Sequence, residues 1–264
     1  MIDPARLSLN LVTVDHWSLP EAAERTAAAG IRWVAPWRHQ LAAAGGVDAA
    51  ARAIRDAGLQ VSSLCRGGFF TAPGAEEDNR RAVEQAAALG APVLVLVCGP
   101  PVGGDLPAAR AAIAAGIEHL LPYAAEHGVR LGIEPLHPMM VGERSAIVTL
   151  GEALALARSF GDPGVGVVVD AYHVFWDPQL EPLLAGAGGL VAAHHVCDWL
   201  VPTTDLLAGR GLMGDGIIDL PALRRMIEGA GYDGPIEVEV INPALAAVPP
   251  DELLADIAAR FARG

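Results

Sequence analysis

A regular alternation of short apolar runs with longer helix-like segments constrains this chain more than any other feature. Eight such pairs follow one another across the 264 residues, at a mean spacing of about 33 residues. The apolar runs are rich in Val, Leu and Ile along their whole length, which is typical of strands buried on both faces of a parallel sheet. The expected strands are residues 7–14, 31–37, 59–64, 92–97, 131–133, 164–169, 190–197 and 235–241. The expected helices are residues 18–30, 47–57, 76–89, 107–127, 150–160, 178–184, 220–229 and 250–262.

This repeat predicts an α/β fold, a single (β/α)8 TIM barrel that takes up residues 1–264 as one domain. Barrels of this length are ordinary single domains, and no domain-scale linker interrupts the sequence. An open doubly wound sheet is the competing architecture. It is disfavoured because no GxGxxG motif follows the first strand.

Four of the later strands end in side chains that can ionise. Glu134 follows residues 131–133 and comes just before a proline, Asp170 follows the sixth strand, His195 lies in the seventh, and Glu239 lies in the eighth. A carboxylate is costly to bury unless it has a partner or a chemical task. Neighbouring parallel strands of a barrel end on one face, so these four side chains are expected to converge.

Three oxygen ligands and one imidazole suit a divalent ion such as Mn2+ or Mg2+, with Co2+ or Zn2+ as alternatives. Two choices within the set stay open in the sequence. Strand alternation sends His194 and His195 to opposite faces, and His195 is preferred because Asp198 lies close by. Glu237 and Glu239 share a face, and Glu239 is preferred as the residue nearer the end of the strand.

Composition excludes several classes of function. The chain has no lysine, and all 18 basic residues are arginine, so a Schiff-base mechanism and a Walker-type phosphate site are excluded. The net charge of −13 argues against nucleic acid as a partner. The sequence shows neither a signal-peptide pattern nor an apolar run that would cross a membrane. Three cysteines without CxxC spacing indicate free thiols, and the expected location is the cytoplasm.

The motifs around these residues resemble the xylose isomerase-like TIM-barrel superfamily, and within it the sugar phosphate isomerase/epimerase group. The resemblance covers essentially the whole chain. It rests on Ile133-Glu134-Pro135-Leu136-His137, Asp170-Ala171-Tyr172-His173, His195-Val196-Cys197-Asp198, Arg210 with the following Gly214-Asp215-Gly216, and Glu237-Val238-Glu239.

The resemblance implies one divalent metal ion held by Glu134, Asp170, His195 and Glu239. It also implies that Glu134 and Glu239 flank the substrate as acid and base, while His173 and Arg210 bind substrate oxygens. His137 stands where ketose epimerases have asparagine, and it resembles the additional histidine of dehydratase and deglycosidase members. His137 is therefore a further candidate acid or base.

The function expected from these features is a metal-dependent isomerase or epimerase that acts on a small carbohydrate or keto-polyol through an enediolate. The alternatives are a lyase, either an inosose or 3-dehydroshikimate-type dehydratase or a C-glycoside deglycosidase, and a non-catalytic ligand-binding or partner subunit. Arg66, Trp176 and Trp199 are candidate substrate-binding residues near strand ends. A homo-oligomer is an expectation from the resemblance alone.

Overall fold

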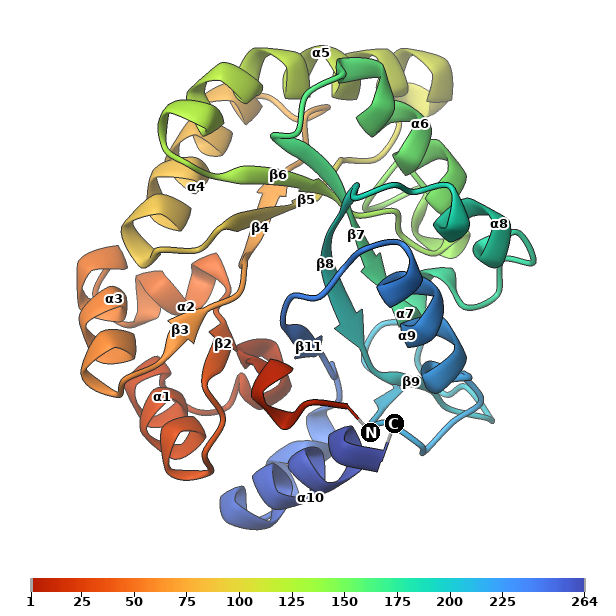
Figure 1. Cartoon of the computed structure of the whole chain (residues 1–264). Coiled ribbons are helices and arrows are strands. Elements are labelled where there is room, and N and C mark those ends of the chain that lie inside the picture. The colour runs from red at the N-terminus through yellow and green to blue at the C-terminus, as the bar shows by residue number, and fades with distance from the viewer. Residues whose placement is uncertain (1, 264) are drawn as a thin grey trace.

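The computed structural model describes residues 2–263 and contains a closed barrel of parallel strands (Figure 1). The sheet order is β3-β2-β1-β11-β8-β7-β6-β5-β4. β3 and β4 follow one another in the chain through Ser62 and Ser63, so the two ends of this order are joined and the sheet closes. The strands are β1 (Leu7–Asn10), β2 (Trp33–Ala35), β3 (Gln60–Val61), β4 (Leu64–Gly68), β5 (Val93–Val97), β6 (Arg130–Ile133), β7 (Val165–Asp170), β8 (Val191–Val196) and β11 (Ile236–Val238). The predicted (β/α)8 barrel is thus confirmed.

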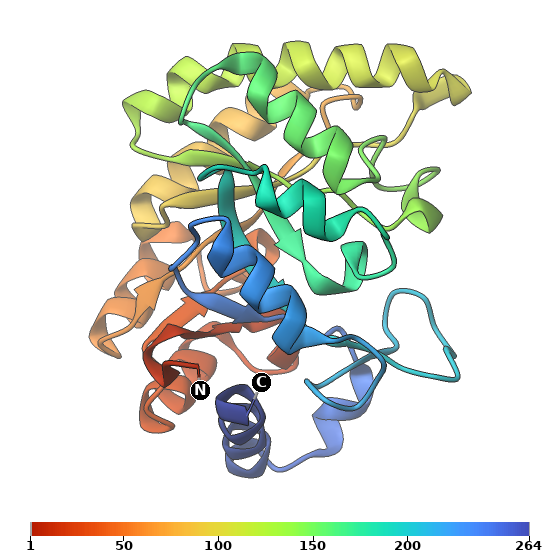
Figure 2. The same ribbon diagram turned by 45° about the vertical axis from the view of Figure 1, so that its right-hand side comes forward.

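Helices surround the barrel, as Figures 1 and 2 show from two directions. The α-helices are α1 (Leu19–Ala28), α2 (Arg38–Ala43), α3 (Val47–Asp56), α4 (Ala75–Leu89), α5 (Leu106–Glu126), α6 (Leu150–Phe160), α7 (Ala171–Val174), α8 (Leu180–Ala185), α9 (Leu220–Gly229) and α10 (Pro250–Arg263). The 3-10 helices are η1 (Pro4–Arg6), η2 (Leu11–Val14), η3 (Val102–Gly104), η4 (Pro138–Met140) and η5 (Pro243–Ala247). None of the described helices is both long enough and apolar enough to cross a membrane.

Local sequence signals set many of these helix ends. Ser18 caps α1 by accepting a hydrogen bond from the Glu21 N–H. Thr149 and Asp219 cap α6 and α9 in the same way. Gly90 ends α4 at a φ of 71°, a left-handed conformation that glycine adopts without steric cost.

Four expected strands differ from those observed by more than one residue at an end, and the second strand is shortened to Trp33–Ala35. The first strand stops at Asn10, because the Asn10 side chain accepts the Val12 N–H and turns the chain into η2. The third strand is divided into β3 and β4, since the chain leaves its pairing with β2 and takes up pairing with β5. The eighth strand is only Ile236–Val238, so Glu239 lies just beyond it. The sequence analysis also missed the short helices α2 and α7.

A small apolar cluster fills the inside of the barrel. Cys65, Val95, Val168 and Ala193 are buried there, with Trp37 packed against them. The barrel interior is therefore a packed core, and it has room for a site only where the strands end. A short hairpin of β9 (Asp198–Trp199) and β10 (Arg210–Gly211) lies in the chain after β8 and brings Arg210 back to that end.

Candidate functional site

The four side chains expected to converge do so at the carboxyl ends of β6, β7, β8 and β11. Each of Glu134, Asp170, His195 and Glu239 offers one ligand atom, and these four atoms lie within 4.8 Å of one another. All four side chains are buried. We call these four residues the acidic wall. β6, β7, β8 and β11 are consecutive neighbours in the sheet, which is why residues separated in sequence meet here.

His195 lies at the centre of the acidic wall. Its Nδ1 lies 2.9 Å from Glu239 Oε2 and 3.6 Å from Glu134 Oε1. Its Nε2 lies 3.2 Å from Glu237 Oε2. Neither ring nitrogen is aligned for a hydrogen bond with any described residue. Burial alone would lower the pKa of His195, but the Glu237 charge and the neighbouring carboxylates raise it well above its ordinary value.

His194 points to the opposite face of the sheet, as strand alternation predicts. Its Nδ1 donates a hydrogen bond to the Val169 carbonyl oxygen at 3.0 Å, so this nitrogen carries the proton. Burial lowers the pKa of His194 to about 4, and the ring is neutral at ordinary pH. His194 is therefore a core residue and stands outside the acidic wall.

Arg210 places a guanidinium group between two carboxylates of the acidic wall. Its Nη1 donates to Asp170 Oδ2 at 3.2 Å and to Glu239 Oε1 at 3.3 Å. The guanidinium carbon lies 4.4 Å from the centre of the Tyr172 ring. Burial raises the pKa of Asp170 to about 7, although the Arg210 charge acts in the opposite direction. One arginine thus offsets only part of the buried negative charge.

Glu237 belongs to a hydrogen-bonded network one step deeper in the barrel. Ser62 Oγ donates to Glu237 Oε1 at 2.7 Å, and Asn10 Nδ2 donates to Glu237 Oε2 at 3.1 Å. The same Asn10 amide donates to Glu239 Oε2 at 3.3 Å, and Trp37 Nε1 donates to Asn10 Oδ1 at 2.8 Å. The sequence analysis missed Asn10 and Ser62. Polar residues within apolar strands are the signal that could have found them.

The chemistry of the acidic wall fits a divalent cation. Three buried carboxylates meet one imidazole, and Arg210 is the only arginine that pairs with them among the described residues. Oxygen-rich sets with one histidine suit hard or borderline divalent ions. Cys65 lies nearby, but burial raises the pKa of its thiol well above the ordinary value, so it stays protonated. The residues present could therefore hold one ion.

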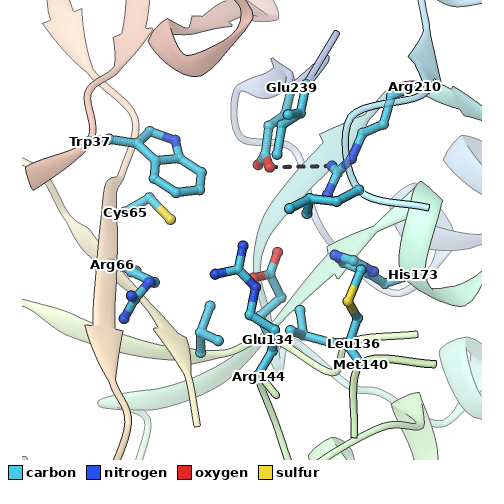
Figure 3. A pocket seen from close by; sticks show the side chains of 13 residues that line it. Trp37, Cys65, Arg66, Glu134, Leu136, Met140, Arg144, His173, Arg210 and Glu239 are labelled. Carbon is cyan, nitrogen blue, oxygen red and sulfur yellow. Dashed lines mark hydrogen bonds and ion pairs between the residues drawn. The ribbon is translucent and has the colours of Figure 1, made fainter. Parts of the chain in front are cut away.

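A pocket opens beside the acidic wall (Figure 3). Glu134, Glu239, His173 and Arg210 line one side of it, while Trp37, Cys65, Arg66 and Arg144 contribute to its remaining lining. The apolar residues Val97, Leu136, Met140, Leu207 and Ile241 complete the lining. The pocket combines an apolar floor with polar groups that converge on it, as small-molecule sites do.

His173 has a defined tautomer. Its Nδ1 accepts a hydrogen bond from the His137 backbone N–H at 3.1 Å, so the proton is on Nε2, which lies 3.6 Å from Asp170 Oδ2. Burial, and after it the Arg210 charge, lower the pKa of His173 well below its ordinary value. His173 is thus a neutral hydrogen-bond donor that lines the pocket.

His137, Trp176 and Trp199 lie apart from the lining of the pocket. The His137 ring centre is 5.6 Å from that of Trp176 and 5.3 Å from that of Trp199. Trp199 stacks on Tyr172 with ring centres 4.6 Å apart, and Trp176 Nε1 donates to the His173 carbonyl oxygen at 2.8 Å. These three residues therefore form an aromatic cluster that supports the segment carrying His173.

Arg66 and Arg144 both line the pocket. Arg66 was expected there from its place at the end of the third strand. The sequence analysis missed Arg144, which lies in the loop between β6 and α6. It is the only arginine in that loop, and this was the signal by which the sequence could have indicated it. Asp198, in contrast, lies outside the pocket lining and accepts hydrogen bonds from the Trp199, Gly214 and Ile218 N–H groups, which fixes the loop after β8.

Comparisons with known proteins bear on the whole chain. The family described as xylose isomerase-like TIM barrel matches residues 23–263. No curated protein matches the sequence significantly. Among solved structures, a protein of Sinorhizobium meliloti 1021 is 45% identical with a TM-score of 0.93, and the match covers 99% of this chain and 98% of that one.

Two more distant structures share the fold. One is a protein named IOLI with a bound zinc atom, which is 18% identical over 97% of this chain and 96% of that one, with a TM-score of 0.83. The other is a D-psicose 3-epimerase studied in the presence of D-fructose, 15% identical over 97% of each chain, with a TM-score of 0.77.

Proposed function

Because the chain belongs to the xylose isomerase-like TIM barrel family, we propose that it is a divalent-metal-dependent isomerase or epimerase of a small carbohydrate or keto-polyol. The observation that carries this proposal is the convergence of Glu134, Asp170, His195 and Glu239 beside a pocket. A non-catalytic subunit would have no need to bury three carboxylates together, since that arrangement costs stability.

The proposed ligands are the four residues of the acidic wall, and the proposed ion is Mn2+. A zinc atom in the IOLI neighbour and a keto-sugar with the epimerase neighbour are consistent with such a site. When bound, the ion would polarise a substrate carbonyl and stabilise the negative charge that develops on it.

Glu134 and Glu239 are the proposed acid and base. Figure 3 shows both carboxylates reaching into the same pocket from β6 and β11. Asn10 and Arg210 each donate a hydrogen bond to Glu239, which fixes its orientation and favours its ionised form. In the proposed reaction one glutamate takes a proton from the carbon next to the carbonyl, leaving an enediolate. Return of a proton to carbon from the other side gives the epimer, and return to the neighbouring carbon gives the isomer.

His173 and Arg210 have different proposed tasks. His173 presents its Nε2–H near the pocket and can donate to a substrate oxygen. Arg210 already bonds to Asp170 and Glu239, so its main task is to orient those two carboxylates. Arg210 is thus a positioning residue as well as a donor at the edge of the pocket.

The position of His137 favours isomerisation over the lyase alternative. A lyase that used His137 as acid or base would need its ring in the pocket, whereas the ring packs against Trp176 and Trp199. Its Nδ1 also accepts the Met139 N–H at 3.2 Å, which keeps the ring turned toward its own loop.

The proposed setting is the cytoplasm, with a small molecule as the partner rather than nucleic acid or a membrane surface. The three cysteines are free and buried, which is consistent with a reducing compartment.

The experiment is incubation of Mn2+-loaded protein with ketoses, inososes and dehydroshikimate in D2O, followed by mass spectrometry. Gain of one deuterium without loss of water supports the proposal, and loss of water would replace it by a dehydratase. Glu239→Gln should abolish deuterium gain. Glu118→Gln, an exposed glutamate on α5, is the matched control and should leave it unchanged.

A further inference from the structure

Two further arginines, Arg66 and Arg144, line the same pocket as Glu134 and Glu239. Arg66 comes from β4 and Arg144 from the loop between β6 and α6, and both guanidinium groups are visible in Figure 3. The same two residues also line an adjoining hollow toward Arg38 and Asp78. Burial lowers the pKa of Arg66, and the charge of Arg144 lowers it further, as expected for two arginines that line the same two hollows. We call Arg66 and Arg144 the basic wall.

Neither arginine of the basic wall has a carboxylate within 4.0 Å among residues 2–263. Several other sheltered arginines have such partners: Arg6 pairs with Glu228, Arg38 with Asp78, Arg110 with Glu152, Arg210 with Asp170 and Glu239, and Arg260 with Asp215. Arg130 instead donates to the backbone carbonyl oxygens of Gly189, Leu190 and Val191. The chain has 31 acidic residues for 18 basic ones, so partners are not scarce. Two unpaired like charges at one pocket are costly unless a ligand supplies the negative charge.

The local structure holds the Arg66 side chain in place. Its guanidinium carbon lies 4.0 Å from the centre of the Phe69 ring, so its flat face is covered and its N–H edges remain free for a ligand. Phe69 adopts a φ of 49°, which is uncommon for a bulky residue, and its N–H donates to the Val97 carbonyl oxygen at 2.7 Å. Arg38 Nη1 donates to the Arg66 carbonyl oxygen at 3.3 Å. These contacts therefore hold the Arg66 guanidinium in one orientation before a ligand binds.

Arg38 itself is not available to a ligand in the same way. Its Nη1 and Nη2 donate to both carboxylate oxygens of Asp78 at 2.8 Å, and its Nε donates to Gln85. The paired Arg38 and the unpaired basic wall stand next to each other in the same hollow. Because Arg38 is already paired with Asp78, Arg66 and Arg144 are the arginines of this hollow that could bind an anion.

We propose that the substrate carries one anionic group, a carboxylate or a phosphate, which Arg66 and Arg144 bind while its carbonyl end lies at the acidic wall. The assignment of the carbonyl end rests on the proposed function; the anion site rests on the basic wall alone. Trp37 also lines the pocket and can cover an apolar face of the substrate. Bidentate guanidinium contacts suit both carboxylate and phosphate.

The test is isothermal titration calorimetry of Mn2+-loaded protein with D-fructose, 5-keto-D-gluconate, D-fructose 6-phosphate and inorganic phosphate. At least one anionic sugar should bind about tenfold or more tightly than D-fructose, as expected for hydrogen bonds to a charged group. Preference for 5-keto-D-gluconate identifies a carboxylate, and preference for D-fructose 6-phosphate or inorganic phosphate identifies a phosphate.

Arg66→Gln and Arg144→Gln should each remove most of this preference, because they weaken binding of the anionic sugar far more than binding of D-fructose. Arg52→Gln, an exposed arginine on α3, is the matched control for the change in charge and should keep the preference. Circular dichroism of each variant checks that it is folded. The proposal is overturned if no anionic sugar binds more tightly than D-fructose. It is also overturned if the two variants weaken the binding of D-fructose as much as the binding of the anions.

The two proposals fail separately. Arginine-dependent anion binding without deuterium exchange in D2O keeps the anion site and rejects the isomerase. Deuterium exchange into a neutral ketose, without preference for any anion, keeps the isomerase and rejects the anion site.

Discussion

The two walls of the pocket treat charge in opposite ways. In the acidic wall, Arg210 is buried and bonded to Asp170 and Glu239, so part of the negative charge is already neutralised by the protein. In the basic wall, Arg66 and Arg144 have no acidic partner among the described residues. The buried Arg210 is bonded to carboxylates of the site itself, whereas Arg66 and Arg144, in our proposal, bind an anionic group of the substrate.

Loss of an acidic-wall ligand should have the largest effect. Asp170→Asn removes one negative charge and one proposed ligand, so we expect loss of stoichiometric Mn2+ and a decrease in kcat/KM of about 10³-fold or more. Metal content by inductively coupled plasma mass spectrometry and steady-state kinetics measure both. A variant that kept full metal content and full activity would remove Asp170 from the site.

The paired Arg210 and the unpaired Arg66 should differ sharply in their contribution to the free energy of unfolding. Arg210→Met leaves two buried carboxylates without their cation, and we expect the chelated protein to lose about 3–5 kcal/mol of unfolding free energy. Arg66→Met breaks no ion pair and should change it by less than about 0.5 kcal/mol. Urea denaturation of both variants compares them directly. Equal losses would show that the two walls do not differ in this respect.

His137→Asn should have a modest effect, because the ring packs outside the pocket. We expect turnover to fall by less than about tenfold, through disturbance of the segment that carries His173. The readout is kcat with metal content measured in parallel. Collapse of turnover at unchanged metal content would place His137 in the chemistry and favour the lyase.

The smallest expected effect on stability comes from Asp78, the carboxylate that pairs with Arg38. The hydrogen bond from Arg38 lowers the pKa of Asp78, so its stabilising contribution is present above about pH 4 and is lost as the pH falls through the depressed value. Asp78→Asn should therefore cost under about 1 kcal/mol at pH 7 and almost nothing near pH 2. Urea denaturation at the two pH values tests this, and a pH-independent cost would point to lost packing instead.

The fold and much of the site could be predicted because both follow from strand periodicity. Apolar runs fixed the order of the strands, and parallel strands end on one face, so Glu134, Asp170 and Glu239 were expected to meet. Alternation along β8 likewise distinguished His195 from His194. These signals are local and repeat along the chain.

Other parts depend on tertiary packing that no local pattern encodes. Arg144 lies in a loop held beside the segment after β5, where the Gly99 N–H donates to the Arg144 carbonyl oxygen. Asn10 reaches Glu237 only because β1 pairs with β11. Trp176 and Trp199 were expected to bind substrate, and this stays a prediction; in the structure both pack against His137 and neither is among the residues that line this pocket. The division of the third strand into β3 and β4 follows from closure of the barrel, which is a property of the whole sheet.

The most direct measurement is a titration of chelated protein with Mn2+, following bound ion by electron paramagnetic resonance and deuterium gain of the substrate in the same samples. The account predicts that exchange rises in proportion to bound ion and levels off at one ion per chain, which is the capacity of the four converging ligands. Exchange at the full rate in chelated protein, or binding of the ion without any exchange in the presence of a bound substrate, would contradict it.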